Sequence, residues 1–158
     1  ECGGPRDRER RGIHGIDAFL QLAGDQDVVV EQASFGRPLH GAAVEDYALI
    51  VLRAGDGGIG LIEAGYTYAS MTRGIFEWRV SARNATLIDR GDGLEVATLD
   101  DGAVRELPAT PVARRYDALM ADTLDRLRAG RKPAVSLCDH WRAMEIIDRC
   151  YALRGEER

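Results

Sequence analysis

Alternating apolar and polar positions dominate the middle of the chain, from about residue 27 to residue 109. A period of two is the pattern of a β-strand that buries one face. Gly, Asp, Asn and Pro separate these runs, so we expect short turns and antiparallel pairing of consecutive strands. The pattern predicts strands at residues 27–35, 46–54, 59–68, 75–83, 85–90, 94–100 and 103–109.

Apolar residues at helical spacing occur instead near the two ends of the chain. The first predicted helix covers about residues 14–23, and Gly24 is suited to the left-handed conformation that ends a helix. The second runs from Pro111 to Gly130, and the third follows Ser136, which forms a potential capping box with Asp139. The second helix is predicted to bury one stripe, made of Tyr116, Leu119, Met120, Thr123, Leu124 and Leu127. An apolar stripe along the third helix is made of Trp141, Met144, Ile147 and Tyr151.

This order of elements predicts an α+β fold with a mainly antiparallel sheet. We expect the helices to pack on one face of the sheet and the other face to stay open, where it could form a dimer interface. A length of 158 residues fits a single domain, residues 1–158. Because the sequence begins with Glu1 rather than Met, we also expect it to be part of a longer protein.

Composition narrows the class of partner. A hydrophobic content of 45% and a net charge of −5 are typical of a soluble globular protein and argue against a nucleic-acid partner. No apolar run is long enough to span a membrane.

Cys138 and Cys150 fall on one predicted helix, too far apart to form a disulfide, which favours reduced thiols and a cytoplasmic protein. The histidines are too scattered along the sequence to predict a metal site.

The stretch Gly55-Asp56-Gly57-Gly58-Ile59-Gly60 matches the glycine pattern of dinucleotide-binding loops. That loop requires a strand before the glycines and a helix after them, because the pyrophosphate binds at the helix N-terminus. Residues 59–68 alternate with a period of two, which predicts a strand rather than a helix. We therefore expect a β-hairpin and no cofactor-binding residue in this chain.

His14 and Asp17 are the main candidates for catalytic residues. Their spacing of three residues places both side chains near the same side of a helix. A carboxylate beside an imidazole can hold its tautomer while the other ring nitrogen exchanges a proton with a substrate. The alternative is that one of the two side chains only caps the first turn of the helix.

Three segments in order resemble a known family: "GIHGIDAFLQLAGD", "VEDYALIVLRAGDGGIGLIEAGYTY" and "YDALMADTLDRLRAGRKPAVSLCDHWRAMEIIDRCYAL". Together they are similar to the C-terminal domain of the glucose-fructose oxidoreductase / inositol dehydrogenase / rhizopine catabolism (Gfo/Idh/MocA) family. The resemblance covers nearly the whole chain, from Gly12 to Leu153. It implies an N-terminal Rossmann domain, absent from this chain, that binds NAD or NADP and carries the family's catalytic lysine.

The resemblance also implies roles for individual residues. His14 matches the histidine of the family's His-x-x-Asp segment, which binds substrate hydroxyls or moves a proton, and Asp17 matches its aspartate. Many members have an Asp four residues before the histidine, where this chain has Arg10. Arg10 would suit a carboxylate or phosphate on the substrate, although the arginine-rich stretch around it also fits a solvated arm.

We therefore interpret this chain as a substrate-binding and oligomerisation domain of an NAD(P)-dependent oxidoreductase that acts on a sugar, polyol or related hydroxy compound. We expect the chain alone to be inactive, and the complete protein to form a homo-oligomer through the open sheet face. The alternative is a non-catalytic dimerisation or protein-interaction module. In that case the pair His14 and Asp17 would contribute to stability only.

Overall fold

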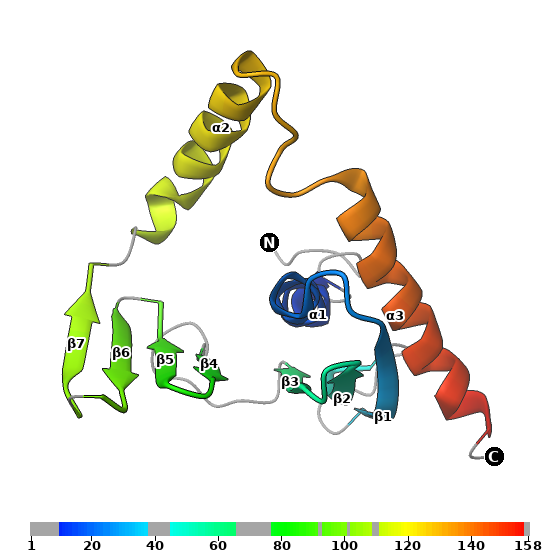
Figure 1. Cartoon of the computed structure of the whole chain (residues 1–158). Coiled ribbons are helices and arrows are strands. Elements are labelled where there is room, and N and C mark those ends of the chain that lie inside the picture. Colours follow the sequence, from blue (N-terminus) through cyan, green and yellow to red (C-terminus); the bar gives the residue numbers. More distant parts are fainter. Residues whose placement is uncertain are drawn as a thin grey trace. The chain divides into compact units, whose positions relative to one another are not determined.

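The computed structural model of the chain describes residues 10–37, 45–65, 77–91, 93–100, 102–108 and 111–156 (Figure 1). In the sequence order of this part of the chain, one helix precedes and two helices follow the strands of two antiparallel sheets, which confirms the predicted α+β fold. Contacts divide the chain into two compact units. The first comprises Glu1–Tyr68 and Val135–Arg158, and the second comprises Ala69–Ala134.

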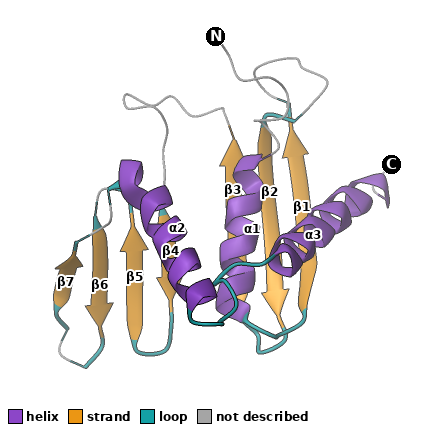
Figure 2. Cartoon of the chain, turned by 90° about the horizontal axis from the view of Figure 1, so that it is seen from above, coloured by secondary structure: helices purple, strands orange, loops and turns teal. Residues whose placement is uncertain are grey.

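The first unit contains a three-stranded sheet and two helices. Its strands pair in the order β1-β2-β3, and both pairs are antiparallel. The helices lie on the same side of the sheet (Figure 2), where α1 contacts β3, α3 contacts β1, and the two helices contact each other. The elements are α1 (Arg10–Ala23), β1 (Val28–Gly36), β2 (Tyr47–Ala54), β3 (Ile59–Gly65) and α3 (Leu137–Glu156).

The core of this unit lies between the sheet and the two helices. Ile16 of α1 and Leu52 of β2 are fully buried in this core, where water is excluded. From α3 the spacing of three and four residues brings one stripe into the core. The buried hydrophobic residues of this core are Ile16, Leu20, Val28, Ala33, Ile50, Leu52, Ala54, Ala143, Ile146 and Cys150.

A β-bulge in β1 keeps the apolar residues of this strand on the core face. Val30 pairs with Leu52 and Gln32 pairs with Val51, so Glu31 is an extra residue without a counterpart on β2. Before the bulge the buried residue is Val28, at an even position, and after it the buried residue is Ala33, at an odd position. Because strand side chains alternate between faces, one inserted residue is what allows both to face the helices.

Both helices of the first unit have the predicted terminal signals. Gly24 adopts a φ of 61°, which ends α1, and its N–H donates to the carbonyl of Leu20 at 3.0 Å. At the start of α3, Ser136 and Asp139 form the predicted capping box, in which the Ser136 N–H donates to Asp139 at 2.7 Å. Hydrogen bonds from Ser136 lower the pKa of the Asp139 carboxyl, because they stabilise its charged form.

The second unit contains a four-stranded antiparallel sheet and one helix. The sheet order is β4-β5-β6-β7, so the predicted meander is confirmed. Arg115 links the helix to the turn between β5 and β6, since it donates to the Gly91 carbonyl at 3.0 Å. The elements are β4 (Trp78–Ser81), β5 (Ala85–Asp89), β6 (Leu94–Thr98), β7 (Val104–Leu107) and α2 (Val112–Arg128).

The predicted burial of the α2 stripe was wrong, and the apolar stripe predicted along α3 is buried only in part. Tyr116 of α2 is 79% exposed and Trp141 of α3 is 68% exposed, although Ile147 of the same predicted stripe packs against the core. The stripe of α3 that enters the core is shifted by about one residue, because Ala143 and Ile146 face the sheet. Apolar spacing identified the helices, but it did not identify which neighbouring face covers each stripe.

The two described cysteines lie on α3 as predicted, and both are free thiols. Cys138 is exposed, whereas Cys150 is 1% exposed in the core. Burial raises the pKa of the Cys150 thiol to about 11, because the apolar surroundings disfavour the thiolate. The thiolate is the reactive form, so Cys150 is protected both by its burial and by its protonation.

We predict that iodoacetamide at pH 8 alkylates Cys138 and leaves Cys150 unmodified in the folded protein. With a pKa of about 11, roughly one Cys150 in a thousand is a thiolate at pH 8. Peptide mapping by mass spectrometry separates the two sites, and the same reaction in urea provides the control in which both are labelled. Equal labelling of the two cysteines without denaturant would contradict the burial of Cys150.

Candidate functional site

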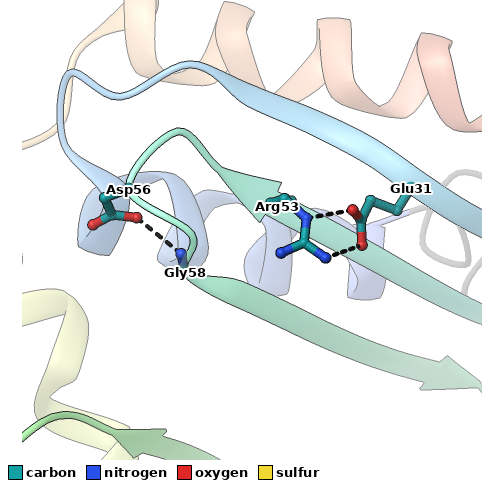
Figure 3. Close-up of polar contacts among 4 residues, drawn as sticks. All are labelled: Glu31, Arg53, Asp56 and Gly58. Carbon is teal, nitrogen blue, oxygen red and sulfur yellow. Dashed lines mark hydrogen bonds and ion pairs between the residues drawn. The ribbon is translucent and has the colours of Figure 1, made fainter.

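The glycine-rich stretch forms the tight turn between β2 and β3. The Ala54 N–H donates to the Gly58 carbonyl at 2.8 Å, and Gly57 adopts a φ of 90°. Asp56 closes the turn, because its Oδ1 accepts a hydrogen bond from the Gly58 N–H at 2.9 Å (Figure 3). The predicted β-hairpin is therefore confirmed.

This turn does not have the form of a dinucleotide-binding loop. The residues that follow the glycines, Ile59–Gly65, form strand β3 and pair with β2 along its length. A pyrophosphate binds such loops through the unpaired N–H groups at the start of a helix, and here a strand occupies that position. The residues of this turn therefore do not fit a nicotinamide cofactor.

Helix α1 carries the candidate residues. It begins at Arg10, four residues earlier than predicted, so His14 and Asp17 lie beyond its first turn. The interpretation of either side chain as an N-terminal cap is therefore wrong, because a cap bonds the free N–H groups of the first turn. As predicted, their spacing places them near the same side of the helix, with His14 exposed and Asp17 partly buried.

The opposite side of α1 fixes the helix in the unit. Ile16 and Leu20 are buried in the core, four residues apart on the face that meets the sheet and α3. At the C-terminal end, Arg142 of α3 donates to the carbonyl of Gly24 at 2.6 Å and also to the carbonyl of Gln26. A cation at this end stabilises the helix, because the last carbonyls carry partial negative charge. His14 and Asp17 are therefore presented by a helix held along one face and at its end.

The structure places His14 and Asp17 near the same side of α1. Within the described residues, no hydrogen bond or ion pair joins the two side chains. Arg10 is the first residue of α1, and its side chain lies outside the described residues. The described site is thus an exposed imidazole with a carboxylate one turn further along the helix.

Two glycines that the sequence analysis did not single out as functional lie beneath this site. Gly15, next to His14, faces Ile62 of β3, and Gly60 of β3 faces Phe19 of α1. A Cβ atom at Gly60 would lie 2.5 Å from Cδ2 of Phe19. A glycine at a core-facing strand position is a signal of close backbone approach, and Gly60 has this pattern.

The second face of the β1-β2-β3 sheet is not covered by the described helices of its unit. Tyr47 donates to Glu63 at 2.9 Å on this face, and Arg53 is paired with Glu31 (Figure 3). The hydrogen bond to Glu63 raises the pKa of the Tyr47 phenol, and Glu31 raises the pKa of the Arg53 guanidinium. We call this surface the open face, formed by Val29, Gln32, Ser34, Tyr47, Leu49, Val51, Arg53, Ile59, Leu61 and Glu63.

Apolar side chains on the open face are more exposed than in an ordinary core. Ile59 is 61% exposed and pairs with Arg53, and Leu61 is 69% exposed and pairs with Val51. An apolar surface bordered by polar pairs is typical of an interaction site.

The described residues contain neither a candidate metal site nor a helix that could span a membrane. Within residues 10–37, 45–65 and the later described ranges, no three His, Cys, Asp or Glu side chains are grouped so that they could hold a metal ion. His40 and Cys2 lie outside the described residues. No described helix is long and apolar enough to cross a membrane.

Comparisons with known proteins gave matches among solved structures only. No protein-family model matches the chain, and no curated protein sequence matches it significantly. An oxidoreductase from Agrobacterium radiobacter, solved in complex with NAD+, L-tartaric acid and magnesium, is 21% identical with a TM-score of 0.76. The match covers 95% of this chain and 47% of the oxidoreductase.

Two further matches are sugar-related enzymes by name. An aldose-aldose oxidoreductase from Caulobacter crescentus, complexed with glycerol, has a TM-score of 0.70 and 22% identity over 93% of this chain and 44% of its own. A UDP-N-acetylglucosamine 3-dehydrogenase from Acidithiobacillus ferrooxidans has a TM-score of 0.68 and 15% identity, over 88% and 45%.

The chain spans less than half the length of each of these three proteins. At these identities the likeness concerns the fold, and it extends over nearly all of this chain. This chain therefore shares its fold with a part of each of these oxidoreductases, which agrees with the fold that the sequence resemblance implied.

Proposed function

We propose that this chain is the substrate-binding and oligomerisation domain of an NAD(P)-dependent oxidoreductase. The observation that carries the proposal is α1, which presents His14 to solvent with Asp17 on the same side, on a fold shared with an NAD+-bound oxidoreductase. A helix fixed along its buried face can hold a reactive side chain in a constant position.

The chemistry assigned to this chain is the movement of a proton. Oxidation of an alcohol to a carbonyl removes a hydride from carbon and a proton from the hydroxyl oxygen, and the nicotinamide cofactor supplies the hydride acceptor. His14 accepts the hydroxyl proton, since imidazole exchanges protons near neutral pH. Asp17 binds substrate hydroxyls beside it, and Arg10 binds an anionic group of the substrate where one is present.

The cofactor is held outside these residues. This assignment is supported by the turn at Gly55–Gly58, which leads into strand β3 instead of a helix. In the complete protein a second, Rossmann-type part holds NAD or NADP, and this chain alone does not turn over substrate. The matched proteins are each more than twice as long as the region that this chain covers, which leaves room for such a part.

We expect NADH and NADPH titrations to show that the complete protein binds the nucleotide and that this chain alone does not. The complete protein should bind one of the two nucleotides, seen as a change in nicotinamide fluorescence, and the 158-residue chain should bind neither. Circular dichroism of the chain alone is the control that it is folded during the titration. Tight nucleotide binding by the isolated chain would contradict the hairpin interpretation of Gly55–Gly58.

The proposed substrate is a sugar, a polyol or a related hydroxy compound. The names of two matched enzymes, the aldose-aldose oxidoreductase and the UDP-N-acetylglucosamine 3-dehydrogenase, support this class. Adjacent donor and acceptor groups such as His14 and Asp17 suit neighbouring hydroxyls. Free thiols at Cys138 and Cys150 support a location in the reducing cytoplasm.

We predict that His14→Ala in the complete protein lowers kcat by about 100- to 10,000-fold, the usual contribution of a positioned acid or base. The assay follows NAD(P)H absorbance with a panel of aldoses, polyols and nucleotide sugars. Stability should change little, because His14 is exposed. The matched control is His140→Ala, which removes an exposed histidine at the start of α3.

A different outcome would favour the non-catalytic alternative. If His14→Ala and His140→Ala both retain the turnover of the parent protein per folded molecule, His14 has no role in catalysis. The domain would then serve for dimerisation or for binding another protein through its open face.

The open face is the proposed homodimer interface. It combines exposed apolar side chains at Ile59 and Leu61 with the pairs Tyr47–Glu63 and Arg53–Glu31 at its borders. In a dimer related by a twofold axis, the same surface of each copy faces the other, so a single substitution acts twice.

We expect Leu61→Glu to dissociate the dimer of the complete protein, because it places two unpaired carboxylates in an apolar interface. Sedimentation velocity at micromolar concentration measures the change. Leu99→Glu is the matched control, since Leu99 is 75% exposed in the turn after β6. A parent protein that is monomeric, or a dimer that Leu61→Glu leaves intact, would rule out this interface.

A further inference from the structure

Helix α1 and strand β3 make a reciprocal pair of contacts through glycines. Gly15 of α1 faces Ile62 of β3, and one helical turn later Phe19 of α1 faces Gly60 of β3. At each contact a large side chain fills the space that a glycine leaves on the other element. The contacts allow the backbones to approach more closely than two ordinary residues would permit.

The spacing of the two contacts is matched on the two elements. Gly15 and Phe19 are four residues apart, a rise of about 6 Å along a helix. Gly60 and Ile62 are two residues apart, about 6.8 Å along a strand, and both face the core side of the sheet. A helix shifted along β3 would lose both contacts together. The pair therefore fixes the position of α1 along the strand as well as its distance from it.

Neither contact has room for a methyl group. A Cβ atom at Gly15 would lie 2.7 Å from Cγ2 of Ile62, and Ile62 is β-branched with few alternative side-chain conformations. A Cβ atom at Gly60 would lie 2.9 Å from Cγ of Phe19, an atom that rotation of the ring does not move. In both cases something must shift, and a shift of the helix is the expected response because the neighbouring atom is close to the backbone of its own residue.

We infer that Gly15 and Gly60 are positioning residues that set where α1 presents His14 to the substrate. The inference rests on the proposed function of His14, which precedes Gly15 directly in the sequence. A displacement of α1 at Gly15 moves His14 with it. Misplacement of a proton-transfer group by about 1 Å is enough to lower the reaction rate about 100-fold.

Gly12 supplies a matched control on the same helix. A Cβ atom at Gly12 would meet no atom within 4 Å, so Gly12→Ala and Gly15→Ala gain the same helix propensity but differ in their contact with the sheet. The variants for the complete protein are Gly12→Ala, Gly15→Ala, Gly60→Ala and the double variant Gly15→Ala/Ile62→Ala. The double variant removes the Ile62 atoms that a Cβ at Gly15 would meet.

Two measurements report on the position of His14. The first is the ¹³Cε1–¹H signal of His14 in histidine-labelled protein, assigned by its loss in His14→Gln. The second is kcat and KM with the substrate identified by the sugar and polyol panel. Gly15→Ala and Gly60→Ala should shift the His14 signal and lower kcat at least tenfold, whereas Gly12→Ala should leave the signal in place and kcat within twofold. Ile62→Ala should restore a large part of the loss in the double variant.

The outcomes separate this inference from the function on which it rests. If Gly15→Ala and Gly60→Ala match Gly12→Ala in signal and in kcat, the glycines do not position His14 and the inference is overturned. If His14→Ala retains full turnover, the proposed role of His14 fails, and the His14 signal alone then reports whether the glycines fix α1. If Gly15→Ala does not fold, a folded double variant with the parent His14 signal supports the inference, and a displaced signal there contradicts it.

Discussion

The distance at which α1 packs on the sheet is the constraint on which the first unit depends. Ile16 and Leu20 of α1 are buried in the core, and the contact of this helix with β3 leaves no room for a Cβ atom at Gly15 or at Gly60. Arg142 then joins α3 to the C-terminal end of α1. The core, the contact between the two helices and the candidate residue His14 therefore all involve α1, the helix that packs closely on β3.

Much of the fold could be predicted from the sequence because its signals are local. Alternation located every strand to within a few residues, and Asp56 with Gly57 located a turn whose hydrogen bonds depend on neighbouring atoms alone. The start of α1 was placed four residues late, because Gly12 is a poor helix former and the apolar spacing becomes regular only after it. Packing of the following residues against the sheet stabilises the helix despite this glycine.

Features that depend on distant residues could not be predicted in the same way. The spacing of Tyr116 and Trp141 shows that their helices have an apolar stripe, but a spacing carries no information about the surface that covers it. Gly60 was placed correctly on the predicted strand at residues 59–68, but spacing could not predict its contact with the ring of Phe19, 41 residues earlier. The candidate site was found through the spacing of His14 and Asp17, yet its supporting contacts became evident only in three dimensions.

The bulge at Glu31 has a consequence for the comparison of related sequences. Core-facing residues have even numbers before the bulge and odd numbers after it. Val28 and Ala33 therefore share a face although they are an odd number of positions apart. A relative that lacks this one residue would have to be aligned with a single gap at this point, even where the surrounding letters agree better without it. At identities near 20%, the position of that gap decides which upstream residues are compared as core and which as surface.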